Sequence, residues 1–204
     1  MKNGVRYICF DTETTGTSYK RGHKVIEIGC VEIVNEQITD KTFQCYLNPE
    51  REIDKEAENV HGISTDFLKD KPLFSQIAHE FLAFIQNSVL VIHNAAFDIG
   101  FINNELSLAN LPHIENEVID TLILARKQFV GERASLDALC KRFEIDTSQR
   151  TMHGALLDSS LLAQVFLKLD SLMNVHLRKI RHIEDEIFVR ENYNLIHHTI
   201  LTDG

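Results

Sequence analysis

Four acidic residues stand where apolar segments end or face the core, and their placement limits the fold more than any other feature of the sequence. Asp11 and Glu13 come directly after residues 5–10, which are nearly continuously apolar and are predicted to form a buried strand. Their spacing of two residues directs both side chains to the same side of an extended chain. Asp98 and Asp158 lie on the core-facing stripes of two predicted helices.

Each of these acids has a simple explanation on its own. Asp98 and Asp158 could be acids near helix N-termini, where the helix dipole favours them, and Glu13 could be a loop acid. Together they are better explained by a shared cation, because close carboxylates repel and an unpaired buried carboxylate is costly. All four side chains offer oxygen, which suits Mg²⁺ or Mn²⁺ and not Zn²⁺. We therefore predict a divalent-cation site formed by Asp11, Glu13, Asp98 and Asp158.

The remaining hydrophobic pattern predicts a mixed sheet flanked by helices. Apolar segments predict strands over residues 5–10, 25–34, 42–47, 89–92 and 118–119. Helical spacing predicts helices over residues 74–85, 97–109, 121–130 and 155–169. Ser135 is a plausible N-cap and predicts a further helix that begins at residue 135. The first three strands suit an antiparallel meander, and alternating strands and helices then favour parallel pairing. We expect an α/β fold with a mixed five-stranded sheet, and a loop over residues 12–22.

His153 precedes Asp158 by five residues, a separation of about 140° around a continuous helix. The two side chains can converge only if His153 lies in the loop before the helix, which Gly154 permits. A histidine beside a metal site is suited to act as a general base, because its ordinary pKa lies near neutral pH. The alternative is that His153 is one of ten scattered histidines, most of them at the surface.

Three segments resemble the motifs of the DEDD superfamily of exonucleases. Residues 10–16 (FDTETTG) resemble the first motif, and residues 93–98 (HNAAFD), continued by Phe101 and Glu105, resemble the second. Residues 153–158 (HGALLD) resemble the third in its histidine form, H-x-A-x-x-D. Residues 60–63 (VHGI) match a family loop that covers the terminal nucleotide of the substrate.

The chain thus resembles the DEDDh, or DnaQ-like, 3′→5′ exonucleases over residues 5 to about 169. Segments 126–127, 135–140 and 150–158 are most similar to the epsilon, proofreading subunits of bacterial DNA polymerase III. The resemblance implies a ribonuclease H-like fold, two divalent cations held by the four acids, and His153 as the base that activates water. It also implies substrate contacts from Asp11, Glu13, Thr14, Thr15, Glu56, His61 and Asp158, with Thr14 and Thr15 at the terminal sugar, in part through their backbone.

The implied activity is release of nucleoside 5′-monophosphates from the 3′ end of single-stranded or mispaired DNA, in proofreading for a polymerase catalytic subunit. One alternative is a stand-alone enzyme of the same family that acts on RNA or short oligonucleotides. Another is a non-catalytic scaffold, whose signature would be a lost acid or base. All four acids and the histidine are present.

Three polar residues near the motifs have simpler explanations than catalysis. Glu27 lies inside a strand-like segment, and a local pair or a solvent-facing position explains it better than metal binding. Asp120 precedes a predicted helix and is expected to be its cap. His93 ends a buried strand and is expected to support the site.

The net charge of −9 argues against broad, sequence-independent nucleic-acid binding, but not against a nuclease whose metal ions meet the phosphate. Cys9, Cys30, Cys45 and Cys140 form no C-x-x-C pair, so we expect reduced, largely buried thiols and no zinc site. The sequence has neither an apolar stretch long enough to span a membrane nor a signal peptide, which favours the cytoplasm.

We expect an exonuclease domain over residues 1–170 and a C-terminal helical extension over 171–204. Its helical apolar stripe consists of Met173, Leu177, Ile180, Ile183 and Ile187. This stripe would either pack on the domain itself or dock a polymerase or a second copy of the chain. The clamp-binding peptide usual in this family, which begins with Gln, is not found after the last domain helix.

Overall fold

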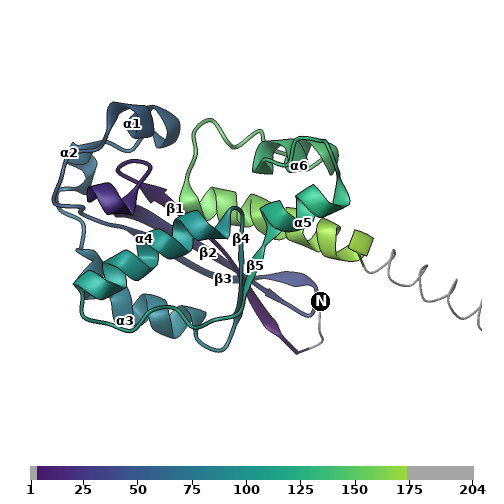
Figure 1. Cartoon of the computed structure of the whole chain (residues 1–204), viewed down its shortest axis with the longest axis horizontal. Coiled ribbons are helices and arrows are strands. Elements are labelled where there is room, and N and C mark those ends of the chain that lie inside the picture. The colour runs from purple at the N-terminus through teal and green to yellow at the C-terminus, as the bar shows by residue number, and fades with distance from the viewer. Residues whose placement is uncertain (1–3, 174–204) are drawn as a thin grey trace, which may run out of the picture. The chain divides into compact units, whose positions relative to one another are not determined.

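The computed structural model describes residues 4–173, which contain a mixed five-stranded sheet with helices (Figure 1). The strands are β1 (Arg6–Thr14), β2 (Val25–Val34), β3 (Gln37–Tyr46), β4 (Val89–Ile92) and β5 (Val118–Asp120). The α-helices are α1 (Lys55–His61), α2 (Thr65–Leu68), α3 (Phe74–Ile85), α4 (Ala95–Leu108), α5 (Thr121–Gln128) and α6 (Leu136–Arg142). A short 3₁₀ helix spans Tyr19–Arg21, and residues 155–173 are helical.

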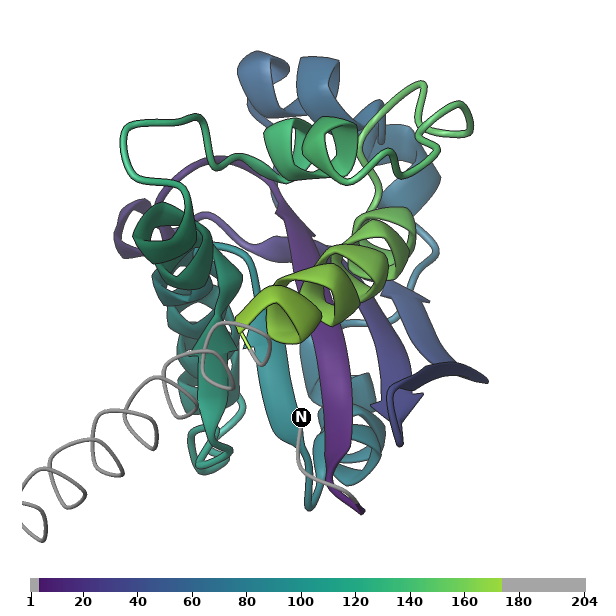
Figure 2. The ribbon, with the colours of Figure 1, turned by 90° about the vertical axis from the view of Figure 1, so that its right-hand side faces the viewer.

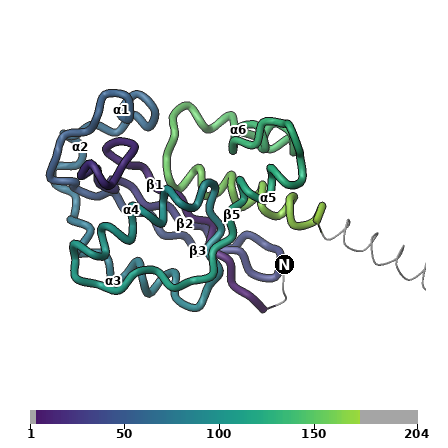
Figure 3. Tube along the Cα trace, in the orientation of Figure 1, coloured from purple at the N-terminus to yellow at the C-terminus, as the bar shows by residue number. Residues whose placement is uncertain are grey.

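The strand order is β3-β2-β1-β4-β5. β1 pairs antiparallel with β2, and β2 pairs antiparallel with β3, so the first three strands form the expected meander (Figure 3). β4 pairs parallel with β1, and β5 pairs parallel with β4. The predicted mixed sheet is therefore confirmed.

β1 is the central strand and is buried on both faces, which explains its nearly continuous apolar sequence. On one face Phe10 packs 5.7 Å from Phe81 of α3, in a core that also includes Phe101 of α4. On the other face Tyr7 packs 5.6 Å from Phe166 of the helix that begins at residue 155. Figure 2 shows this helix lying across the strands.

Several element boundaries differ from those expected. β1 continues to Thr14 where a loop was expected from residue 12, because Asp11 and Glu13 pair through their backbone with Gly29 and Glu27 of β2. β3 begins at Gln37, not residue 42, because the exposed start of this edge strand has too few apolar residues to be recognised. Helices α1 and α2 lie in a segment for which no element was expected.

The chain divides into two compact units, Met1–Leu167 and Lys168–Gly204. The expected extension over residues 171–204 falls almost wholly outside the described residues, as do Leu177, Ile180, Ile183 and Ile187 of its stripe. Its role therefore stays a prediction. Within residues 4–173, no helix is long and apolar enough to cross a membrane.

Gly29 allows the helix that begins at residue 155 to approach β2 closely. A Cβ atom added at Gly29 would lie 2.1 Å from the backbone carbonyl carbon of Ala155. Ser159 fixes the same contact, because its hydroxyl donates to the Gly29 carbonyl over 2.8 Å. This close approach sets the position of Asp158, one residue before Ser159.

We predict that Gly29→Ala lowers the free energy of unfolding by about 1–3 kcal/mol, because backbone atoms cannot move aside as a flexible side chain can. Urea denaturation measures this change. Gly154→Ala is the matched control, since a Cβ there meets only Glu27 Oε2, at 3.8 Å. Equal stability of Gly29→Ala and the wild type would contradict the close packing.

Candidate active site

The four acids come from three elements that meet at one end of the sheet. Asp11 and Glu13 lie in the last part of β1, Asp98 lies in the first turn of α4, and Asp158 lies in the first turn of the helix that begins at residue 155. Asp98 and Asp158 are only 3% and 4% exposed. Ligand atoms of Glu13, Asp158 and His153 lie within 4.8 Å of one another.

Asp98 is joined directly to β1 through Thr12. The Thr12 backbone N–H donates to Asp98 Oδ1 over 3.0 Å, and the Thr12 hydroxyl donates to the same oxygen over 2.7 Å. Thr12 alternates with Asp11 and Glu13 along the strand. Thr12, which lies between the two acids of the first motif, thus holds the acid of the second.

Burial, and to a smaller extent neighbouring carboxylates, disfavours the ionised forms of Asp11, Glu13 and Asp98. Desolvation, followed by the charges of Asp158, Glu27 and Asp98, raises the pKa of Glu13 to about 8. Desolvation raises the pKa of Asp98 to about 7, although the hydrogen bonds from Thr12 act against the rise. Desolvation and then the Asp98, Glu13 and Asp158 carboxylates also raise the pKa of Asp11 well above its usual range.

This cluster fits a divalent cation. Asp158 Oδ1 is buried and accepts no hydrogen bond from any residue among 4–173, although Arg150 Nε lies 2.6 Å from it as an ion-pair contact. A buried carboxylate oxygen without a donor is costly, and a cation would satisfy it. Four carboxylates provide the oxygen ligands that hard cations such as Mg²⁺ and Mn²⁺ prefer.

His153 lies in the loop before the helix, as the sequence required for it to reach Asp158. Its backbone N–H donates to the Val60 carbonyl over 3.2 Å, which ties this loop to the end of α1. Its Nδ1 lies 3.0 Å from Asp158 Oδ2, and the imidazole is 43% exposed. The ring therefore touches both the acid cluster and solvent.

A cavity of about 280 Å³ opens beside the acids. Its lining includes Glu13, Thr14, Glu56, His61 and Phe97. Burial lowers the pKa of His61, and its Nδ1 accepts a hydrogen bond from the Ile63 N–H over 3.0 Å. A neutral His61 therefore carries its hydrogen on Nε2, as a donor.

Thr15 does not line this cavity, although the family resemblance placed it at the terminal sugar beside Thr14. The Thr15 side chain is fully buried, its hydroxyl lies 3.1 Å from His23 Nδ1, and it accepts a hydrogen bond from the Lys24 N–H over 3.0 Å. The Thr15 carbonyl accepts from the Asp54 N–H over 2.9 Å. Thr15 thus joins β1 to the segment before α1.

Glu27 is buried and does not face solvent, so only the local-pair part of its expected role agrees with the structure. Its Oε1 accepts from Gln44 Nε2 over 2.8 Å. Its Oε2 accepts from the Ala155 N–H over 3.0 Å, at the start of the helix that carries Asp158. The sequence spacing could not reveal this second contact, which joins residues 128 positions apart.

Asp120 is a helix cap, as expected, and it caps two helices. It accepts hydrogen bonds from the N–H groups of Leu122 and Ile123 in α5, and also from those of Asn94 and Ala95 at the start of α4. His93 Nδ1 lies 2.9 Å from the hydroxyl of Thr121, and burial lowers the pKa of His93. Both residues support the segment that leads to Asp98.

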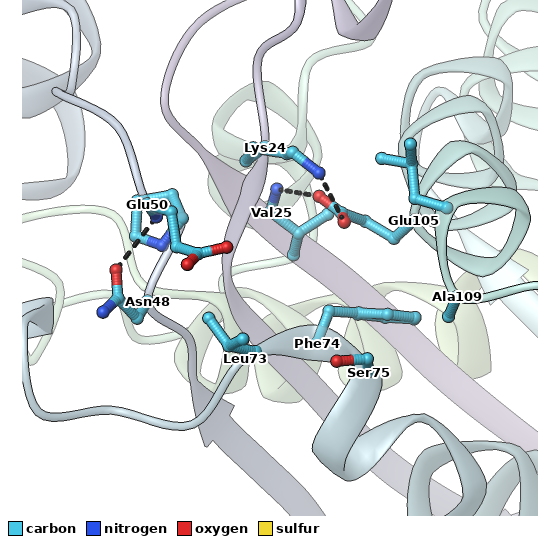
Figure 4. A pocket seen from close by; sticks show the side chains of 11 residues that line it. Lys24, Val25, Asn48, Glu50, Leu73, Phe74, Ser75, Glu105 and Ala109 are labelled. Atoms are coloured by element: carbon cyan, nitrogen blue, oxygen red, sulfur yellow. Dashed lines mark hydrogen bonds and ion pairs between the residues drawn. The ribbon is translucent and has the colours of Figure 1, made fainter.

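Glu105 shows how an acid in this fold is neutralised away from the cluster (Figure 4). It lies beside a cavity of about 180 Å³, where Lys24 Nζ is 3.1 Å from its Oε2. The Val25 N–H donates to its Oε1 over 3.2 Å. Glu105 therefore contacts a cation, Lys24, and a backbone donor, the Val25 N–H. These two contacts join α4 to the start of β2.

Arg150 is a site residue that the sequence did not single out. Its guanidinium contacts both Asp158 and His153. The sequence offered Arg150 only as the first residue of the epsilon-like segment 150–158 and as a cation three residues before His153. The cysteines agree with expectation, because Cys9, Cys30 and Cys140 are buried, Cys45 is half-buried, and all four are free.

We predict that, without divalent cations, the free energy of unfolding falls as the pH rises from 6.5 to 8. The pKa values of Asp98 and Glu13 in the folded chain, about 7 and about 8, exceed their unfolded values of about 3.9 and 4.3. The folded state therefore binds more protons than the unfolded state in this range, and its stability is lost as those protons leave. The limiting slope is about 1.4 kcal/mol per pH unit for each proton.

Urea denaturation in EDTA and in Mg²⁺ measures this effect, and Mg²⁺ should restore more stability at pH 8 than at pH 6.5. The lowered pKa values of His61 and His93 oppose this trend near pH 6.5, where the unfolded rings, with a pKa of about 6.5, hold more protons than the folded rings. This opposition fades as the pH rises and the unfolded rings also become neutral. Glu13→Gln should flatten the decline. Asp66→Asn, at an acid 84% exposed, should not. Stability that rises with pH in EDTA would contradict the prediction.

Comparison with known proteins gives the family. A family model described as an exonuclease, RNase T, matches residues 8–166. DNA polymerase III subunit epsilon of Rickettsia typhi is 54% identical over 171 residues, which cover 82% of this chain and 75% of that protein. The subunit epsilon of Escherichia coli K12 is 53% identical over 170 residues, which cover 79% of this chain and 70% of that protein.

Solved structures agree with the ribonuclease H-like fold. Exonuclease X in complex with 5′-overhanging duplex DNA matches with a TM-score of 0.64 and 25% identity, over 82% of this chain and 92% of that one. The nuclease domain of 3′hExo, a DEDDh family member, matches with a TM-score of 0.69 and 18% identity, over 83% of this chain and 94% of that one. The chain therefore belongs to the DEDDh exonuclease family, with epsilon subunits of bacterial DNA polymerase III among its relatives.

Proposed function

We propose that this chain removes nucleoside 5′-monophosphates from the 3′ end of single-stranded or mispaired DNA, as a cytoplasmic proofreading exonuclease that acts with a polymerase catalytic subunit. One observation carries the proposal: Glu13, Asp158 and His153 converge beside a cavity lined by Thr14, Glu56 and His61. The sequence identity to epsilon subunits favours DNA and a polymerase partner.

Asp11, Glu13, Asp98 and Asp158 would hold two divalent cations, Mg²⁺ or Mn²⁺. When bound, these ions lower the pKa of the attacking water and offset the charge that develops on the phosphate. The pKa values of Glu13 and Asp98, raised by burial and by the neighbouring carboxylates, support such a role. These acids are poorly stabilised until a cation reaches them.

His153 takes the proton from the attacking water. When Nδ1–H donates to Asp158 Oδ2, 3.0 Å away, the lone pair of Nε2 is free to accept that proton. The 43% exposure of the ring gives water access to it. The carboxylate fixes the orientation of the imidazole and stabilises its charged form.

The cavity beside the acids would hold the terminal nucleotide. Phe97 and Val60 offer apolar contacts to a base or sugar, while Thr14, Glu56 and His61 offer polar contacts. Thr15, which is buried against His23, would act by holding Thr14 in place and not by touching the sugar. A pocket for one nucleotide explains why hydrolysis would begin at a free 3′ end.

We predict that His153→Ala lowers turnover on a 3′-ended oligonucleotide by about 10²–10⁴-fold, the usual range for loss of a general base. Mn²⁺ binding by calorimetry should change little. His79→Ala is the control, because His79 is exposed on α3. Wild-type turnover in His153→Ala would show that another group takes the proton.

The substrate is tested with matched 3′-ended DNA and RNA strands, single-stranded and mispaired, in Mg²⁺ and in EDTA. We expect the fastest release of 5′-monophosphates from single-stranded or mispaired DNA, and none in EDTA, because the acids need their cations. Preference for RNA would instead favour a stand-alone RNA-trimming enzyme. Activity that survives EDTA would contradict a metal-dependent mechanism.

A further inference from the structure

Arg150 lies inside the acid cluster, and the reaction proposed above gives it no part. Its side chain is 8% exposed. Its Nη2 donates to Asp158 Oδ2 over 2.7 Å, and its Nε lies 2.6 Å from Asp158 Oδ1. The second contact is too poorly aligned to be a hydrogen bond, because both atoms lack a hydrogen-bond partner among residues 4–173. The Arg150 guanidinium therefore lies against the carboxylate that a metal ion would use. It donates a hydrogen bond to Oδ2 of that carboxylate but not to Oδ1.

Arg150 also contacts His153. Its Nη2 lies 2.7 Å from His153 Nδ1 and 3.4 Å from His153 Nε2, so the guanidinium lies beside both ring nitrogens. Asp158 Oδ2 lies 3.0 Å from the same Nδ1. Arg150 and His153 therefore share one oxygen of the Asp158 carboxylate.

A second partner for Arg150 lies away from the cluster. Its Nη1 donates to Asp137, in the first turn of α6, and the Asp137 side chain is 68% exposed. Arg150 and Asp137 line one cavity of about 370 Å³, which gives the guanidinium room to move. Because a guanidinium stays charged at any ordinary pH, it can leave Asp158 only by moving.

We propose that Arg150 is a positioning residue that neutralises Asp158 in the metal-free protein, competes with the divalent cation for it, and then relies on Asp137 as its remaining partner. This rests on the metal site of the proposed function. In the metal-free arrangement Arg150 lies against both oxygens of Asp158, and it gives them up as the cation binds.

The test is calorimetric titration of the full chain with Mn²⁺ alone, without DNA. Arg150→Gln should bind Mn²⁺ roughly tenfold more tightly than the wild type, because a competing charge at contact distance is removed. Arg150→Lys keeps the charge and should stay near the wild-type affinity. Arg142→Gln is the matched control, since Arg142 pairs with Glu132 and lies over the Phe129 ring. Its Mn²⁺ affinity should not change.

Asp137→Asn tests the alternative partner, and its exposed position makes loss of folding a small concern. It should weaken Mn²⁺ binding in the wild type, because Arg150 then depends more on Asp158. In the Arg150→Gln background the same change should have less than about a twofold effect. An equal effect in both backgrounds would mean that Asp137 acts on the metal directly, and the exchange would be wrong.

A spectroscopic readout separates this exchange from a merely structural role. The ¹⁵N shift of Arg150 Nε should differ between EDTA and Mg²⁺, because the guanidinium leaves Asp158 and keeps Asp137, whereas that of Arg142 should not change. Unchanged or weaker Mn²⁺ binding by a folded Arg150→Gln protein, or the same Arg150 shift in both conditions, would overturn the proposal. A wild type that binds no Mn²⁺ would instead overturn the metal site itself, so the two failures are distinguishable.

Discussion

The burial of carboxylates that repel one another is the constraint on which the rest of this structure depends. Desolvation and then the charges of neighbouring carboxylates raise the pKa values of Asp11 and Glu13, and desolvation raises the pKa of Asp98. A fold optimised for stability alone would not keep this arrangement. Divalent cations between the acids would offset this cost, and the chain belongs to an exonuclease family.

The surrounding hydrogen bonds oppose this repulsion by fixing each element that carries an acid. Thr12 holds Asp98 from β1, and Asp120 caps the start of α4. Glu27 accepts the N–H of Ala155, so a buried acid on β2 caps the helix of Asp158 across the sheet. None of these three residues needs to touch a substrate, yet each determines where a candidate ligand lies.

The same arrangement separates rigid from adjustable parts of the site. Asp98 and Asp158 belong to helices whose first N–H groups donate to the side chains of Asp120 and Glu27. His153 and Arg150 belong to the loop between α6 and the last helix, so the exchange proposed for Arg150 would not need either helix to move. The acids are therefore fixed by capped helices, while Arg150 and His153 are held by contacts that depend on charge.

The sequence by itself determined the features that follow from the periodicity of residues within one strand or helix. Apolar periodicity predicted the mixed sheet, and acids on apolar stripes predicted the cluster, because period and burial are local properties of a strand or helix. Only the tertiary structure turned Thr15 inward, buried Glu27 under Ala155 and brought Arg150 to Asp158. These contacts depend on how separate segments pack or fold back on one another. The spacing of residues within one segment does not predict such a contact, because the position of the partner residue is fixed by the packing of the whole domain.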